Sequence, residues 1–187
     1  MDERKWIERI LAGDTQSFSC LVAKYEKMAY TIALRILENR EEAEEAVQDA
    51  FVKMYRALSD FHFVSKFSTW FYRIVYRTAL TALRQQRMFV SYEEAGPVDL
   101  SNDEVESATA LLEREDRKEM IARTLKKLPA DEALLLTLYY LEECSVEEIC
   151  QITELSASNV KVKLFRGRKR FYEVLQDKMK LETADLL

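Results

Sequence analysis

The chain has 187 residues and a formal net charge of −5, with 48% hydrophobic and 33% charged residues. This composition excludes an intrinsically disordered chain, because it supplies enough apolar surface for a core. No apolar run approaches the roughly 18 to 20 residues of a membrane span, and the N-terminus is too acidic for a signal peptide. We therefore expect a cytoplasmic protein without membrane insertion.

Only three glycines and two prolines interrupt the chain. Long periodic stretches without these breakers favour helices, so the predicted fold class is all-α. The stretch from Ser91 to Glu106 is acidic, contains no cation and carries a Gly-Pro pair, which is typical of a linker. We predict two small helical domains, at residues 1–90 and 115–178. The acidic linker at residues 91–114 joins them, and a tail follows at residues 179–187.

The N-terminal domain is expected to contain three main helices. Apolar residues recur at helical spacing over residues 15–37, which predicts the first of these helices. Asn39, with Glu42 after it, is a typical N-cap for a second helix that runs to about Leu58. A third helix is expected over residues 65–87.

In the C-terminal domain, Pro129 is expected to open a helix that continues through Leu141. Ser145 and Glu148 have the spacing of a capping box, which predicts a short helix that ends near Ile152. Leu155 is expected to pack the turn that follows, and a longer basic helix comes next. This spacing predicts a helix-turn-helix, whose second helix enters the major groove of DNA.

The last helix contains the stretch "SASNVKVKLFRGRKRFYEVL", in which no acid occurs from Ser156 to Tyr172. Ordinary solvated helix faces mix both signs of charge, so this stretch favours phosphate binding, although a solvated face remains the alternative. The helix N-terminus would add free N–H groups and hydroxyls. The candidate contacts to duplex DNA are Ser156, Ser158, Asn159, Lys161, Lys163, Arg166 and Arg170.

The third helix of the N-terminal domain and the loop before it form a second basic region, again without an acid from Phe61 to Tyr92. Cations that follow a backbone, beside aromatics that stack on bases, are typical of sites for single-stranded nucleic acid. Most of the aromatics here are expected in the core, and Trp70 is the one expected to face a base. The candidate residues are Phe63, Lys66, Trp70, Arg73, Arg77 and Arg84.

The second helix carries apolar side chains among acids, outside its predicted buried stripe. Such a surface indicates a docking site for a helix that is basic and apolar, with an ordinary solvated face as the alternative. The candidate docking residues are Glu41, Glu45, Gln48, Asp49, Val52 and Tyr55.

The sequence offers no convincing catalytic, metal or cofactor site. Its three cysteines lack any CxxC spacing, there is one histidine, and no Gly-rich phosphate loop occurs. We expect the cysteines to be small apolar side chains in or near a core. The protein is therefore predicted to be no enzyme and to need no cofactor, and a helical enzyme is the least favoured class.

Three stretches in order, "NREEAEEAVQDAFVKMYRAL", "FSTWFYRI" and "CSVEEICQITELSASNVKVKLFRGRKRF", resemble the extracytoplasmic-function group of bacterial sigma factors. The resemblance implies that residues 41–58 dock on the β′ clamp helices of core RNA polymerase. Residues 67–84 and the preceding loop would bind and melt the minus 10 element, and the helix-turn-helix would read the minus 35 element. The β flap and an anti-sigma factor are further implied partners.

The chain departs from this family at Arg77 and Thr81, where the family often has Asn and Asp. In the family the linker follows the RNA path of the polymerase, so the acids from Glu93 to Glu106 are hypothesised to mimic nucleic-acid charge there. The leading function is a sigma factor that directs promoter recognition, DNA melting and transcription initiation. The alternative is a free-standing helix-turn-helix regulator whose N-terminal domain senses a ligand or dimerises.

Overall fold

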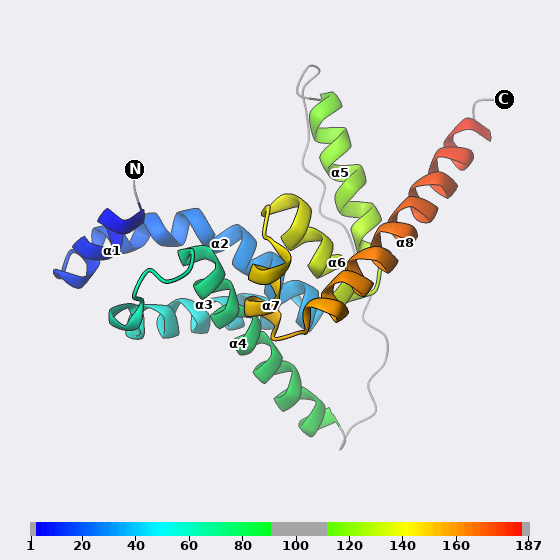
Figure 1. Cartoon of the computed structure of the whole chain (residues 1–187). Helices are drawn as coiled ribbons and strands as arrows, with labels where there is room; N and C mark the ends of the chain where they lie inside the picture. The colour runs from blue at the N-terminus through cyan, green and yellow to red at the C-terminus, as the bar shows by residue number, and fades with distance from the viewer. Residues whose placement is uncertain (1–2, 91–111, 185–187) are drawn as a thin grey trace.

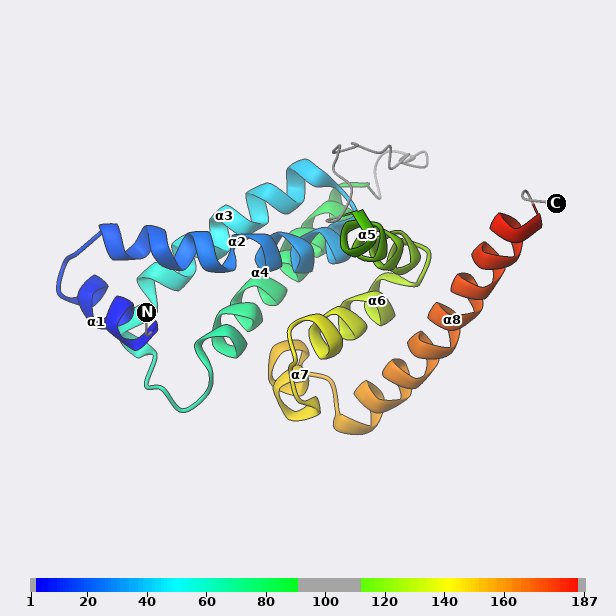
Figure 2. The ribbon, with the colours of Figure 1, turned by 90° about the horizontal axis from the view of Figure 1, so that it is seen from above.

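The computed structural model describes residues 3–90 and 112–184, with side chains over residues 3–86 and 119–177. Every regular element in these ranges is helical, as predicted, and the helices form two domains (Figures 1 and 2). The N-terminal domain consists of α1 (Glu3–Leu11), α2 (Gln16–Leu37), α3 (Arg40–Arg56) and α4 (Phe67–Val90). The C-terminal domain consists of α5 (Leu112–Lys126), α6 (Ala130–Leu136), α7 (Val146–Thr153) and α8 (Ala157–Ala184). The predicted linker acids lie outside the described residues.

Two predicted helix starts are confirmed by their caps. The backbone N–H of Glu42 donates to the Asn39 side chain at 3.2 Å, at the start of α3. At the start of α7, the N–H of Glu148 donates to Ser145 Oγ at 3.1 Å, and the N–H of Ser145 donates to Glu148 Oε2 at 2.8 Å. These bonds satisfy N–H groups that would otherwise lack partners in the first turn.

The predicted helix from Pro129 through Leu141 is present, but its second half is π-helical. The α-helix ends at Leu136 and a π-helical turn, Thr137–Leu141, follows. In this wider turn the N–H of Glu142 bonds the carbonyl of Thr137 at 3.2 Å. The turn keeps Leu138 in the core and leaves Tyr140 and Leu141 on the surface.

The core of the N-terminal domain lies where α2, α3 and α4 pack against one another. Phe71 of α4 is fully buried, and its ring lies 4.8 Å from that of Phe51 on α3 and 5.9 Å from that of Tyr25 on α2. Aromatic pairs at such distances add to the free energy of burial. The helix α1, which the periodicity analysis did not place, covers one end of α2 with Ile7 and Ile10.

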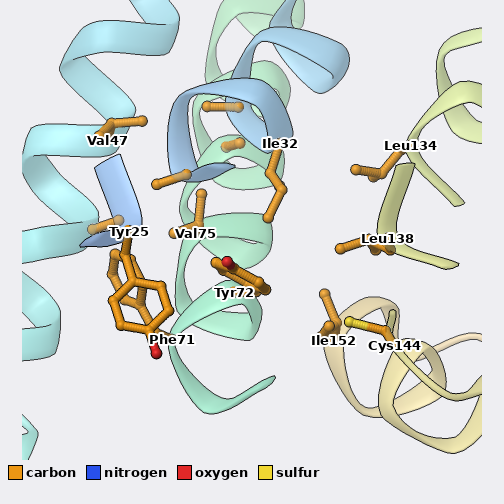
Figure 3. Packing of buried hydrophobic residues seen from close by; sticks show 14 of the residues in the cluster. Tyr25, Ile32, Val47, Phe71, Tyr72, Val75, Leu134, Leu138, Cys144 and Ile152 are labelled. Atoms are coloured by element: carbon orange, nitrogen blue, oxygen red, sulfur yellow. The ribbon is translucent and has the colours of Figure 1, made fainter. Parts of the chain in front are cut away.

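The two domains share an apolar contact in which α4 lies against α7 and α2 lies against α6. Figure 3 shows Tyr72 of α4 on the side that faces Leu138 and Ile152 of the C-terminal domain. All three side chains are buried. Within the described residues, none of the helices is both long and apolar enough to cross a membrane.

In the C-terminal domain α6 packs closely on α8 at Gly167. A Cβ at this position would lie 3.2 Å from Leu136 Cδ1 and 3.3 Å from Glu132 Cβ, which leaves no space for a larger side chain. Gly167→Leu is therefore expected to lower the free energy of unfolding by about 2 kcal/mol through overpacking, measured by urea denaturation. Lys169→Leu, on the exposed side of the same helix, is the control, and an equal effect of the two would contradict close packing at Gly167.

Candidate nucleic-acid interface

The cationic stripe of α4 consists of Lys66, just before the helix, and Arg73, Arg77 and Arg84 within it. All four are exposed, while Val75 and Thr78 on the other side of the helix are buried. Helical periodicity separates the two sides, because residues three, four and seven apart share a face. The stripe is therefore a surface feature.

Trp70 lies beside the stripe and is half-buried. Its ring is 5.1 Å from that of Phe61 and 5.6 Å from that of Phe67. The indole is thus held in place by two core aromatics, and part of its surface is accessible. A ring fixed in this way loses little conformational entropy when another flat group stacks on it.

The loop before α4 presents apolar side chains to solvent. Phe63 is exposed, has a left-handed backbone (φ 55°), and lies with its ring 4.8 Å from the Arg4 guanidinium. Val64 is 94% exposed. Sequence reasoning had missed both residues: Val64 lies in a loop, although the tetrapeptide "HFVS" is unusually apolar for one, and Arg4 lies in α1, a helix that the sequence analysis did not place.

Acids of the C-terminal domain cover part of the stripe, which the sequence had not indicated. Lys66 Nζ lies 3.0 Å from Glu148 Oε1, and Arg73 Nη2 lies 3.1 Å from Glu154 Oε1, which also pairs with Arg77. Hydrogen bonds from the two arginines lower the pKa of Glu154. Burial raises the pKa of Glu148, but its bonds to Ser145 and Lys66 together outweigh burial, and the pKa lies below its ordinary value.

The helix-turn-helix comprises α7, a turn at residues 154–156, and α8. Leu155 packs against the core in the turn, as predicted. Ser156 Oγ accepts a bond of 3.3 Å from the N–H of Asn159 in the first turn of α8. Val160 and Leu164 are buried and fix the helix on the domain.

The predicted duplex-contact residues lie mostly on the free side of α8. All are exposed except Lys163, which is half-buried. Lys163 pairs with Asp131, and Arg170 Nη1 lies 2.9 Å from Glu132 Oε1, so α6 holds two of the cations. The structure records no ion pair for Lys161 and Arg166 within the described part of the chain.

Two apolar side chains on α8 had been missed. Val162 is exposed, and Phe165 is 66% exposed and lies one turn from Lys161. Apolar side chains among base-reading residues can contact the methyl group of thymine. The signal was available in the sequence, since both residues lie outside the buried stripe that Val160 and Leu164 define.

The predicted docking residues lie together on α3. All six are exposed, with Val52 at 48% and Tyr55 at 46%. The Tyr55 ring stands edge-on to Phe18 of α2 at 5.0 Å, which extends the apolar part of this surface onto a second helix. The acids Glu41 and Glu45 lie along the same face one turn apart, so the surface is both acidic and apolar.

The C-terminal domain has an apolar groove of about 390 Å³ between α5, the π-helical turn and α8. Tyr140, Leu141 and Tyr172, which line it, are exposed. The remaining lining residues are Ile121, Leu125, Leu136, Arg168 and Phe171. Sequence reasoning had missed this groove, because its lining comes from α5, α6, the π-helical turn and α8, and because the π-helical turn places Tyr140 and Leu141 on the surface.

The cysteines are all free, and the expectation that all three lie in or near a core is wrong for Cys20, which is exposed on α2. Cys144 is buried, and burial, followed by the charges of Glu148 and Glu142, raises its pKa to about 11. Its thiol is thus protonated at neutral pH, which makes it unreactive. The described part of the chain contains no group of three or more acidic, His or Cys side chains that could hold a metal ion.

Comparison with known proteins gives two family matches, Sigma-70 region 2 over residues 21–88 and Sigma-70 region 4 over residues 118–171. The RNA polymerase sigma-H factor of Pseudomonas aeruginosa is 31% identical over 181 residues, which cover 93% of this chain and 94% of the relative. The chain belongs to the extracytoplasmic-function (ECF) group of RNA polymerase sigma factors. The ECF sigma-E factor of Escherichia coli K12 is 30% identical over 170 residues, covering 87% of this sigma factor and 88% of the relative.

Two solved structures share the fold of this sigma factor. CnrH, determined with the cytosolic domain of CnrY, gives a TM-score of 0.61 at 20% identity and covers 94% of this chain and 97% of CnrH. RpoE of Bartonella quintana, determined with the anti-sigma factor NepR, gives a TM-score of 0.67 at 18% identity. The match covers 86% of this chain and 98% of RpoE. As a sigma factor the protein directs transcription initiation, and the alternative of a free-standing regulator is not favoured.

Proposed function

We propose that this chain is a promoter-specificity subunit with separate surfaces for core polymerase, for parted DNA strands and for duplex DNA. In this proposal residues 1–90 dock on the polymerase and bind the minus 10 element, and residues 115–178 bind the minus 35 element. The observation that carries it is the placement of an acidic and apolar surface on α3 and of two cationic surfaces on α4 and α8. The protein would work in the cytoplasm and would perform no bond chemistry of its own.

We assign the minus 35 element to the exposed side of α8. Arg166 and Lys161 are free to approach base edges or phosphates, and Phe165 beside them can contact a thymine methyl. Asn159 and the hydroxyls of Ser156 and Ser158 lie at the helix N-terminus, where N–H groups and the helix dipole favour phosphate. Arg170, which Glu132 orients, would contact the backbone.

We assign the minus 10 element to the stripe of α4 together with Trp70 and the exposed Phe63. Flipped bases require flat partners, and the cations would follow the backbone of the separated strand. Arg77 replaces the asparagine that is common in the family, so the base preference here is expected to differ from that of typical relatives.

The acidic and apolar face of α3 is proposed to dock on the β′ clamp helices. The apolar groove of the C-terminal domain is proposed to receive the β flap, because an apolar cleft of this size suits the side chains of a helix laid into it. An anti-sigma protein is proposed as a regulator, since RpoE of Bartonella quintana was determined with one.

Trp70→Ala is expected to slow strand opening roughly tenfold and to change closed-complex formation much less, because a base–aromatic stack is worth about 1–3 kcal/mol. Permanganate reactivity of unpaired thymines would measure opening, and filter binding would measure the closed complex. Trp70→Phe is the control, since it retains a ring against Phe61. Equal losses in the two assays would contradict a role in opening.

The proposed function is tested by reconstitution with core RNA polymerase on a fragmented genomic library, with start sites and upstream sequences as the readout. We expect a shared pair of upstream elements and no transcription from core polymerase alone. Failure of the purified chain to bind core polymerase under any salt condition would refute the proposal.

A further inference from the structure

The loop before α4 holds an aromatic residue in a backbone conformation that aromatic residues rarely adopt. Phe63 has a φ of 55°, in the left-handed region that is unfavourable for bulky L-residues. The other non-glycine residues with positive φ in the described chain are glutamates, and Glu38 and Glu154 among them are helix C-caps, where this conformation is common. Phe63 ends no helix, so its conformation needs a different explanation.

Side-chain contacts, and not backbone bonds, hold Phe63. Within the described ranges the structure records no turn or cap hydrogen bond from residues 62–65, and the neighbouring Val64 is almost fully exposed. The Phe63 ring instead contacts two groups, the ring of Phe61 at 4.8 Å and the guanidinium of Arg4 at 4.8 Å. A strained backbone persists only where its surroundings determine it, so these two contacts determine where the ring lies.

The helix α1 supports Arg4 rigidly beside the loop. Ile7 is fully buried and packs α1 on the domain, and Glu3 accepts a hydrogen bond from the hydroxyl of Tyr25, a core residue of α2. Figure 2 shows α1 beside the loop that joins α3 to α4. Arg4 Nε lies 3.4 Å from Glu8 Oε1, one turn further along α1, and this pair orients the guanidinium. The cation is therefore presented to the loop by a helix that is itself fixed.

The contacts of Phe63 continue to the tryptophan of the cationic stripe. Phe61 is buried, and its ring lies 4.8 Å from that of Phe63 and 5.1 Å from that of Trp70. Arg4, Phe63, Phe61 and Trp70 thus form a continuous row from α1 to α4. Phe63 and Trp70 both keep accessible surface, and a ring that is already held in place loses little conformational entropy when a base contacts it.

We infer that Arg4 is a positioning residue for strand opening, because it holds the Phe63 ring in the orientation that receives an unpaired base. This inference rests on the proposed role of the loop and α4 at the minus 10 element. A cation is attracted to the electron-rich face of an aromatic ring, while the rest of an exposed guanidinium stays hydrated. Arg4 therefore holds the ring without covering it, and α1 becomes part of the surface that opens DNA.

The first measurement needs neither DNA nor polymerase. Limited chymotrypsin digestion of the full chain, with mass spectrometry to follow cleavage after Phe63, reports how often the ring leaves its contacts. Arg4→Gln is expected to raise this cleavage rate roughly threefold, which is the factor expected for an exposed cation–π contact. Lys5→Gln is the matched control, because Lys5 is the next exposed cation of α1 and has no recorded contact with the loop among the described residues. Equal cleavage rates in the two variants would overturn the inference.

The second measurement uses the holoenzyme and follows strand opening by permanganate reactivity of unpaired thymines. Arg4→Gln is expected to slow opening roughly threefold relative to Lys5→Gln, with unchanged affinity for core polymerase, and Arg4→Lys is expected to keep most of the rate because it keeps the cation. If Arg4→Gln opens DNA as fast as Lys5→Gln, the positioning role is overturned while the proposed function stands. If the unmodified holoenzyme opens no promoter, the proposed function fails, and the inference fails with it.

A double variant separates positioning from direct contact of Arg4 with DNA. Leucine has no ring face for a cation, so Arg4→Gln added to Phe63→Leu is expected to slow opening no further than Phe63→Leu alone. A further threefold loss in the double variant would show that Arg4 acts on DNA independently of Phe63, and it would overturn the positioning role. Circular dichroism of each variant against Lys5→Gln would confirm equal helix content before the rates are compared.

Discussion

Arg166→Glu is expected to weaken binding of the minus 35 element by about 2 kcal/mol or more, roughly 30-fold. Arg166 is exposed on α8, and no acid is recorded against it within the described residues, so its full charge is available to DNA. A glutamate there loses one attraction and adds a repulsion from the phosphates. Electrophoretic mobility shift or anisotropy of the holoenzyme on promoter fragments would measure the change.

Arg166 is a better position than Lys163 to test DNA contact by α8, because Lys163 is paired with Asp131 on α6. Lys127→Glu is the control, because Lys127 is an exposed cation of the same domain that lies outside α8 and outside the predicted contacts to duplex DNA. The slope of affinity against salt should fall by about one for Arg166→Glu if the residue contacts phosphate. Holoenzyme affinity equal to that of Lys127→Glu would contradict entry of α8 into the groove.

Tyr55→Ala is expected to lower affinity for core polymerase by about 2 kcal/mol, again roughly 30-fold. Tyrosines that are half-exposed and held by a neighbouring ring are typical of residues that dominate interfaces, and Tyr55 stands against Phe18 at 5.0 Å. Competition with a labelled sigma factor for core polymerase, in the absence of DNA, would measure the loss.

Two controls separate docking from folding at Tyr55. Tyr55→Phe retains the ring against Phe18 and is expected to retain most of the affinity. The thermal unfolding midpoint of Tyr55→Ala should change little, because Tyr55 is 46% exposed and its ring packs on Phe18, which is itself only partly buried. Core affinity of Tyr55→Ala equal to that of the unmodified chain would remove α3 from the docking surface.

The sequence predicted those features that depend on residues within one or two helical turns of each other. The caps at Asn39 and at Ser145 with Glu148 were predicted and are present, because a cap is formed by residues three apart. The all-α class and the helix-turn-helix followed from the scarcity of breakers and from periodicity. The π-helical turn at Thr137–Leu141 was missed, since its apolar pattern differs little from that of an α-helix.

The candidate sites were predicted as lists of residues without their surroundings. The charges of α3, α4 and α8 could be assigned to faces from helical spacing alone. The apolar groove beside Tyr140 and the pairing of Lys163 with Asp131 could not be predicted from spacing, because each brings together residues from different helices. The exposed Phe165 could have been found from the sequence, because helical spacing places it outside the stripe of Val160 and Leu164.

By itself, the sequence determined most of the helices, the caps at Asn39 and Ser145, the sign of charge on the faces of α3, α4 and α8 and, through three ordered stretches, the family. Only the tertiary structure decided that acids of the C-terminal domain cover part of the cationic stripe of α4, since Arg73 and Glu154 are 81 residues apart. Caps and helical faces depend on contacts within a few residues, which any single helix contains. A contact between two helices depends on how the domains pack, and no local pattern specifies which acid will meet which arginine.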